Sequence, residues 1–212
     1  DYRLAPEHPY PAAAQDACRA ALWVQQNAAR YGADPSRLVV AGESAGANLA
    51  LAVTVAASYR RPEPWAAAVF DAGVRPVLTF PACGMLQVTD PGRFIRRKPG
   101  MSRFVQSRLQ EVEGGYLRGV HPGPGSLADP LCVLETAGPP ERPLPPMFAP
   151  CGTADPLLDD TRRLGAALDR LGVPHEVRYY PGEVHAFHAL YFREAARRCW
   201  RDHSAFWDRF PP

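Results

Sequence analysis

The stretch at residues 37–53, RLVVAGESAGANLALAV, limits the folds open to this chain more than any other feature. A short apolar run, β-branched at its centre, is followed at once by two glycines that flank Ser44, and then by a long apolar segment. This order predicts a buried strand, a sharp turn and a buried helix. A serine in such a turn projects at the carboxyl end of its strand, beside the first turn of the helix.

The rest of the chain alternates between helical and strand patterns. The Ala-rich segment 12–32 has apolar residues at helical spacing and ends at a glycine, and 157–172 places its leucines on one helical face. Strands are predicted at 77–80, 146–150 and 175–180, and an amphipathic helix closes the chain. This alternation predicts an α/β fold: a mostly parallel sheet with helices on both faces.

The segment from about 84 to 145 has a different composition, with an amphipathic stretch, a Pro-rich tail and no strand pattern. Its basic cluster consists of Arg93, Arg96, Arg97 and Lys98. We expect that cluster to be a solvated face. A long insertion of this kind is often a lid or cap. With 212 residues and no linker or repeat, residues 1–212 are expected to form a single domain that contains this insertion.

Composition argues against several functions. Because the 24 basic residues nearly balance the 22 acidic ones, the sequence gives no electrostatic reason to expect nucleic acid as a partner. No apolar run reaches the roughly 18 residues of a membrane span. The five cysteines form no C-x-x-C pair, which indicates buried, reduced thiols, and we expect no metal or organic cofactor. The cytoplasm is the favoured compartment, but the start at Asp1 leaves any signal peptide unread.

A serine hydroxyl is a weak nucleophile, so Ser44 needs a general base, and that base needs an orienting carboxylate. Asp155 follows the predicted strand at 146–150, and His185 lies in the loop after the next predicted strand. Both therefore reach the sheet edge that carries Ser44. We predict Ser44 as the nucleophile, His185 as the base and Asp155 as the acid. The backbone N–H of Ala45 is predicted to face the developing oxyanion.

Each of these residues has a structural alternative. Ser44 could simply begin a helix, and Asp155 could be only a cap for the helix after it. The aspartates at 159–160 are assigned to the first turn of that helix rather than to the acid role. His188 competes with His185 as the base, and the sequence favours His185 because it follows the glycine turn of its loop more closely.

Other polar residues are given structural roles. Glu43, next to the nucleophile, is expected to orient the site, with a solvated side chain as the alternative. Arg3 and Glu7 are expected to brace the turn at the start of the chain rather than to touch a substrate. The histidines expected at the surface or in satisfied core positions are His8, His121, His175 and His203.

Four blocks, DYRLAPEHPYPAAAQDA, GESAGANLA, GTADPLLDD and YPGEVHAFH, in this order resemble the bacterial hormone-sensitive-lipase-like esterases, a branch of the α/β-hydrolase fold. The similarity runs nearly end to end and is weakest at 60–75. It implies that the serine of the second block, Ser44, is the nucleophile. It also implies that Asp155 in the third block is the acid and that His185 in the fourth is the base.

Members of that family carry an HGGG-type loop upstream of the DYRLAPE block, and its N–H groups complete the oxyanion hole. Here DYRLAPE is the start of the chain, and the adjacent glycines Gly114 and Gly115 lie downstream. We therefore expect the C-terminal portion of such a hydrolase, without its first strands. The strand before Ser44 should then lie at an exposed sheet edge.

The resemblance implies a serine carboxylesterase that hydrolyses short-chain acyl esters through an acyl-enzyme. A catalytically impaired or non-catalytic hydrolase fragment is the alternative, and an amidase, lactonase or acyltransferase with the same triad is a further one. The expected partner is a small-molecule ester. Family members often pair through the last strand, here 175–180, which implies a homodimer.

Overall fold

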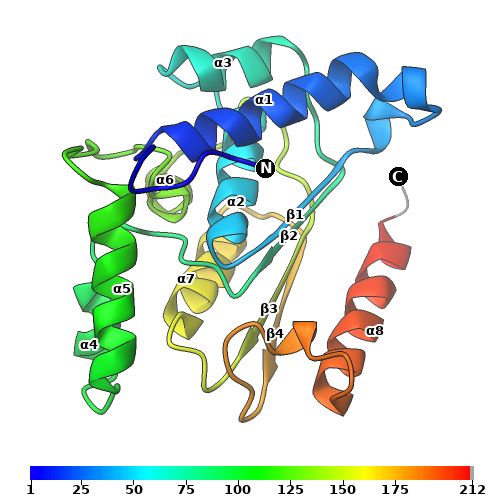
Figure 1. Ribbon diagram of the computed structural model, residues 1–212. Helices are drawn as coiled ribbons and strands as arrows, with labels where there is room; N and C mark the ends of the chain where they lie inside the picture. The colour runs from blue at the N-terminus through cyan, green and yellow to red at the C-terminus, as the bar shows by residue number, and fades with distance from the viewer. Residues whose placement is uncertain (211–212) are drawn as a thin grey trace.

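The computed structural model describes residues 1–210, which form a four-stranded parallel sheet between helices (Figure 1). The strands are β1 (Val39–Glu43), β2 (Leu78–Ala82), β3 (Met147–Gly152) and β4 (His175–Tyr180). They lie in the order β1-β2-β3-β4, and each neighbouring pair is parallel. The predicted α/β fold is thus confirmed.

Two strands run beyond the ends that the sequence predicts. The sequence predicts the third of these strands at 146–150, ending at Pro150. In the structure the Pro150 carbonyl still accepts a hydrogen bond from Cys83 N–H, at 3.0 Å, and β3 continues to Gly152. Similarly, β2 includes Pro81 and ends at Ala82. Both prolines lie in inner strands, although proline has no N–H for the ladder and is usually confined to edge strands.

Eight α-helices lie within the described residues. They are α1 (Ala12–Asn27), α2 (Ala45–Ser58), α3 (Pro64–Asp71), α4 (Gly92–Arg97), α5 (Arg103–Tyr116), α6 (Pro130–Thr136), α7 (Leu158–Arg170) and α8 (Glu194–Arg209). The helix predicted at 12–32 is shorter, because Ala28–Tyr31 forms a 3-10 turn that ends at Gly32. Gly32 has a left-handed φ of 72°, which suits glycine at a helix end.

Alternate residues of the inner strands face opposite helical layers. Phe80 in β2 and Phe148 in β3 pack against Phe206 of α8. Met147 and Ala149 point the other way, into the core shared with α1, α2, α3, α6 and α7. Figure 1 shows α8 on one side of the sheet and α2 and α7 on the other. The helices therefore cover both faces, as predicted, and α2 is buried nearly all round.

At the edge of the described sheet, β1 pairs only with β2. Its residues are half-buried or exposed, whereas every residue of β2 and β3 is buried. This agrees with the exposed edge expected for the strand before Ser44. The site described below therefore stands beside a strand that is paired on one side only.

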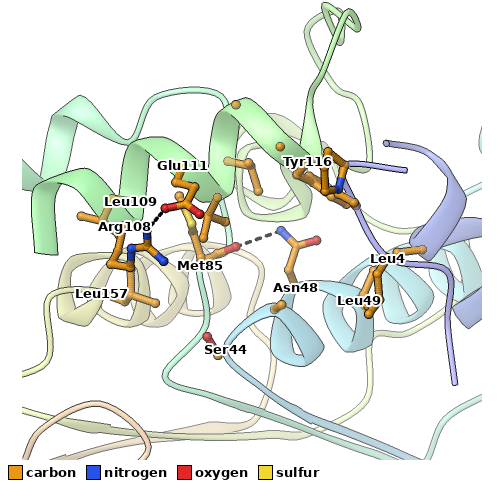
Figure 2. Close-up of a pocket in the computed structure, with 18 of the residues that line it drawn as sticks. Leu4, Ser44, Asn48, Leu49, Met85, Arg108, Leu109, Glu111, Tyr116 and Leu157 are labelled. Atoms are coloured by element: carbon orange, nitrogen blue, oxygen red, sulfur yellow. Dashed lines mark hydrogen bonds and ion pairs between the residues drawn. The ribbon is translucent and has the colours of Figure 1, made fainter. Parts of the chain in front are cut away.

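The insertion between β2 and β3 holds three helices, α4, α5 and α6, and no strand. Asn48 of α2 fastens this segment, because its Nδ2 donates to Met85 O at 2.9 Å and to Ala128 O at 3.1 Å. Figure 2 shows α5 lying across from the start of α2, with a cavity between them. The assignment of this segment as a cap stays a prediction.

For Arg93 the expectation of a solvated basic face is wrong. Its side chain is buried, and its Nε donates to Asp160 Oδ1 at 3.1 Å. Asp160 is fully buried and also accepts from the N–H of Leu86, at 2.8 Å. Asp160 does lie in the first turn of α7, as predicted, but it ties α7 to the insertion. The other three basic residues are exposed, as expected.

All five cysteines are free. Four are buried as expected, whereas Cys132 is only half-buried. No helix within residues 1–210 is both long enough and apolar enough to cross a membrane.

Candidate active site

The carboxyl ends of the parallel strands bring the predicted residues together. Ser44 directly follows β1, Asp155 follows β3, and His185 lies in the loop after β4. His185 Nε2 lies 3.0 Å from Ser44 Oγ, and His185 Nδ1 lies 2.9 Å from Asp155 Oδ2. The three side chains thus form one continuous hydrogen-bonded path.

A strained turn presents Ser44. Its backbone has φ 56° and ψ −113°, a region that residues with a side chain rarely adopt. The turn is fixed by the Ser44 N–H, which donates to Ala82 O at 3.0 Å. It also requires Gly42, because a Cβ there would lie 2.1 Å from Gly46 O. A Cβ on Gly46 would meet nothing within 4 Å, so it is the Gly46 carbonyl that makes the close approach.

Asp155 acts both as a turn residue and as the partner of His185. It is 3 % exposed, and its Oδ1 accepts from Leu157 N–H at 2.7 Å. Its other oxygen faces His185. The two loops can meet because Gly152 has no side chain, since a Cβ there would lie 2.1 Å from Glu183 O.

The pKa of His185 is raised to about 10, chiefly by the hydrogen bond with Asp155 and next by contact with Cys83, while burial opposes the shift. These contacts stabilise the imidazolium. That is the form a histidine takes once it has accepted a proton from Ser44.

The competing histidine has a different partner. His188 Nε2 lies 3.0 Å from Glu43 Oε2, and its Nδ1 is buried without a partner. Burial lowers the pKa of His188, so its Nε2–H donates to Glu43 and its Nδ1 carries only a lone pair. Glu43 directly precedes Ser44, and His188 lies three residues after His185. The contact between Glu43 and His188 is therefore a second link between the serine turn and the histidine loop. Glu43 therefore contacts the histidine loop, as expected of an orienting residue.

A cavity of about 780 Å³ opens beside Ser44 and His185, and its lining is mostly apolar. Figure 2 shows Ser44 at its base, Leu49 of α2 on one side, and Leu109 and Tyr116 of α5 opposite. Ala45 also lines the cavity. Because Ala45 begins α2, its N–H has no partner within the helix and points along the positive end of the helix dipole.

Arg3 braces the start of the chain, as expected, since its Nε donates to Asp16 Oδ2 of α1 at 2.8 Å. It also lines the cavity, which was not expected. Of the remaining histidines, His8 and His121 are exposed. His175 Nδ1 pairs with Val173 O, and His203 packs against Phe80 with its ring tilted by 40°.

The sequence predicts an ordinary buried thiol at Cys83, but this residue belongs to the site. It directly follows β2, as Ser44 follows β1. Its sulfur, a carboxylate oxygen of Asp155 and a ring nitrogen of His185 all lie within 4.8 Å of one another. Within residues 1–210 this is the group of three side chains that could hold a metal ion. Its position directly after an apolar strand is a local signal, but the strand order that brings it to the site is not specified by any local pattern.

A serine raised on a strand–turn–helix unit, with histidine and aspartate supplied from later strand ends, is the arrangement of hydrolases built on a parallel α/β sheet. The family comparison agrees with this class. The model of the alpha/beta hydrolase fold matches residues 1–189, and the chain belongs to that family.

Named relatives are esterases. The chain is 34% identical over 192 residues to Carboxylesterase NlhH of Mycobacterium tuberculosis, covering 88% of this chain and 54% of that protein. The crystal structure of esterase LipW from Mycobacterium marinum superposes with a TM-score of 0.75 at 30% identity, over all of this chain and 62% of that one. A crystal structure of EstE5 soaked with p-nitrophenyl butyrate gives a TM-score of 0.72 at 27% identity, over all of this chain and 65% of that one. The chain thus spans about half the length of NlhH.

Proposed function

We propose that this chain carries the catalytic site of a serine carboxylic ester hydrolase. The observation that carries the proposal is the path from Ser44 Oγ through His185 to Asp155, with distances of 3.0 and 2.9 Å, at the base of an apolar cavity. The esterase names of its relatives support ester hydrolysis as the chemistry.

In the proposed mechanism Ser44 Oγ attacks the ester carbonyl carbon while His185 Nε2 takes its proton. Asp155 holds the imidazole by its Nδ1–H and stabilises the imidazolium. The Ala45 N–H donates to the oxyanion of the tetrahedral intermediate. His185 then protonates the leaving alcohol, and an acyl group remains on Ser44. Water, activated by the same histidine, releases the acid and restores the serine.

Short-chain acyl esters are the proposed substrates. The mostly apolar lining of the cavity favours an uncharged substrate, and its volume of about 780 Å³ is in the range that holds small organic molecules. The soak of EstE5 with p-nitrophenyl butyrate supplies a test substrate of this class.

A catalytically impaired hydrolase is the second candidate, and it is favoured by the oxyanion site. Within the described residues, the backbone N–H of Ala45 is the donor that we assign to the oxyanion. One oxyanion donor is worth about 10²–10³ in turnover. Turnover by this chain is therefore expected to be slow even where Ser44 reacts readily.

We further propose that the protein forms a single domain in which residues 84–145 are the cap, and that it forms a homodimer. We also propose that it is located in the cytoplasm and has no nucleic-acid partner. The position of α5 across the cavity from α2 supports the cap.

The test is to label the 212-residue chain with a fluorophosphonate and to map the labelled peptide. We expect the label on Ser44, its loss in Ser44→Ala and its retention in Ser107→Ala, which changes an exposed serine of α5. Hydrolysis of p-nitrophenyl butyrate and of the corresponding anilide then distinguishes an esterase from an amidase. Label without turnover supports the impaired hydrolase, and no label on Ser44 contradicts both candidates.

A further inference from the structure

The end of β2 carries a residue that the proposed mechanism does not use. Cys83 is fully buried, and its φ of 38° lies in the left-handed region, where a cysteine is rarely found. Its N–H is held by Pro150 O at 3.0 Å, so the backbone position is fixed by the neighbouring strand. This turn directs the thiol toward Asp155 and His185.

The spacing of the three side chains suits a tetrahedral metal ion. Their ligand atoms lie within 4.8 Å of one another, and the His185 and Asp155 atoms are 2.9 Å apart. A zinc ion with sulfur at about 2.3 Å and nitrogen or oxygen at about 2.0 Å keeps its ligands roughly 3.3–3.6 Å apart. Shifts of about 1 Å or less, within the reach of side-chain rotation, bring the three atoms to that separation.

The donor set selects the kind of ion. One sulfur, one nitrogen and one oxygen suit zinc and related thiophilic divalent cations, whereas magnesium and calcium take oxygen ligands. A thiolate, a carboxylate and a neutral imidazole together carry two negative charges. They compensate a divalent cation, which removes the main cost of burying it.

An ion can reach these ligands from the cavity. The His185 side chain is 34% exposed and lines the cavity together with Ser44. Cys83 and Asp155 are buried, with their ligand atoms within 4.8 Å of a His185 ring nitrogen. Three protein ligands leave a fourth position, which water from the cavity fills.

We propose that Cys83, Asp155 and His185 form an inhibitory site for a zinc-class divalent cation, a reading that rests on the proposed function of Ser44. Binding releases the thiol proton to solvent, with no change of oxidation state, and where Nδ1 is the ligand the single proton of the neutral imidazole moves from Nδ1 to Nε2. An ion on Nδ1 leaves the remaining proton on Nε2, facing Ser44. An ion on Nε2 consumes the lone pair there. In both cases His185 can no longer accept the proton of Ser44.

The first experiment follows the rate of fluorophosphonate labelling of Ser44 in the metal-free chain as zinc is added. At a zinc concentration ten times its Kd the rate should fall about tenfold, and excess chelator should restore it. Cys83→Ser should lose most of this zinc effect, whereas Cys132→Ser, which changes a half-buried thiol elsewhere, should keep it. The ratio of rates with and without zinc is compared for each variant, so a change in the basal rate cancels.

A second measurement needs no reactive serine. Cobalt bound to a thiolate gives a sulfur-to-metal absorption band in the near ultraviolet. We expect the band to saturate at one equivalent of cobalt, to disappear in Cys83→Ser and to persist in Cys132→Ser. Circular dichroism checks each fold, and Cys83→Ala replaces the serine variant if the latter does not fold.

The outcomes separate the two proposals. No labelling of Ser44 without zinc contradicts the proposed function, and the cobalt band still decides the metal site. Labelling that zinc does not slow, or a cobalt band that survives the loss of Cys83, overturns the inhibitory site.

Discussion

Ser44 stands in a backbone conformation that the surrounding residues impose. Such strain costs about 1–3 kcal/mol and persists only where neighbouring contacts over-determine it. Here the contacts are the hydrogen bond to Ala82 and the approach of the Gly46 carbonyl to Gly42. The two glycines that flank the serine are therefore unequal, although the sequence pattern treats them alike.

Gly42→Ala should disturb the turn, because the added Cβ would lie 2.1 Å from Gly46 O. We expect a loss of about 1–3 kcal/mol in the free energy of unfolding. We also expect Ser44 labelling to slow by about 100-fold, since a shift of 1 Å at a reacting group costs that much. Gly46→Ala is the matched control, because its Cβ meets nothing within 4 Å. Urea unfolding and labelling rates test the pair, and equal effects of the two substitutions would show the contact to be unimportant.

Glu43→Ala removes the second link between the serine turn and the histidine loop. Because it leaves His188 buried without a partner, the loop should loosen and Ser44 labelling should slow by about 10-fold. Glu43→Gln keeps an acceptor for His188 Nε2–H and should retain most of the rate. Glu194→Ala, which removes an exposed carboxylate from α8, controls for charge. A slow Glu43→Gln variant would mean that the charge of Glu43, and not its hydrogen bond, is what matters.

At the scale of elements, one ion pair fastens the first residues to α1. Arg3 donates to Asp16, and this lowers the pKa of the Asp16 carboxyl to about 2. A lowered carboxyl pKa stabilises the fold above the ordinary value of about 3.8, and that stability disappears as the pH falls toward 2. Since the pair is partly solvated, we expect it to contribute only about 1 kcal/mol.

Asp16→Asn should therefore lower the free energy of unfolding by about 1 kcal/mol near neutral pH, and by progressively less as the pH falls from about 4 to 2. Urea unfolding of both proteins over this range measures the difference. Asp208→Asn, at the far end of α8, provides a control for the general effect of losing one carboxylate. A difference that stays constant down to pH 2 would exclude this ion pair as its source.

The elements that the sequence predicts well are those with a local signal. β4 was predicted at its observed bounds, since 175–180 alternates and is flanked by turn residues, and the turn at Ser44 follows from its glycines. Non-local contacts were beyond reach. Arg93 is buried because Asp160 lies beside it, 67 residues away, and neither position marks the other. Cys83 joins the site only because β2 lies between β1 and β3, an order that no local pattern specifies.

For the whole molecule, the two edges of the sheet differ. β4 carries an ion pair between Glu176 and Arg178, and Glu176 also pairs with Arg209 of α8. β1 has three apolar residues in succession, from Val39 to Ala41, and none of them is buried. Charged edges resist strand pairing, whereas apolar open edges promote it.

We therefore expect the chain to associate through β1 rather than through β4. Val40→Lys should shift sedimentation toward the monomer, because a charge at an edge strand opposes pairing with a second copy. Arg178→Lys, which keeps the charge of β4, should leave association unchanged. Association that is insensitive to Val40→Lys would place the contact elsewhere.

The delivery of one side chain from each strand end makes the site a sensor of folding. Ser44 and His185 are 141 residues apart, and they meet only when the sheet has assembled from β1 to β4. A partly folded chain, in which a single strand has not docked, keeps its serine but loses the activated hydroxyl. The fraction of molecules that react with a serine-directed reagent therefore counts complete sheets, whereas circular dichroism also counts helices in molecules that have not finished folding.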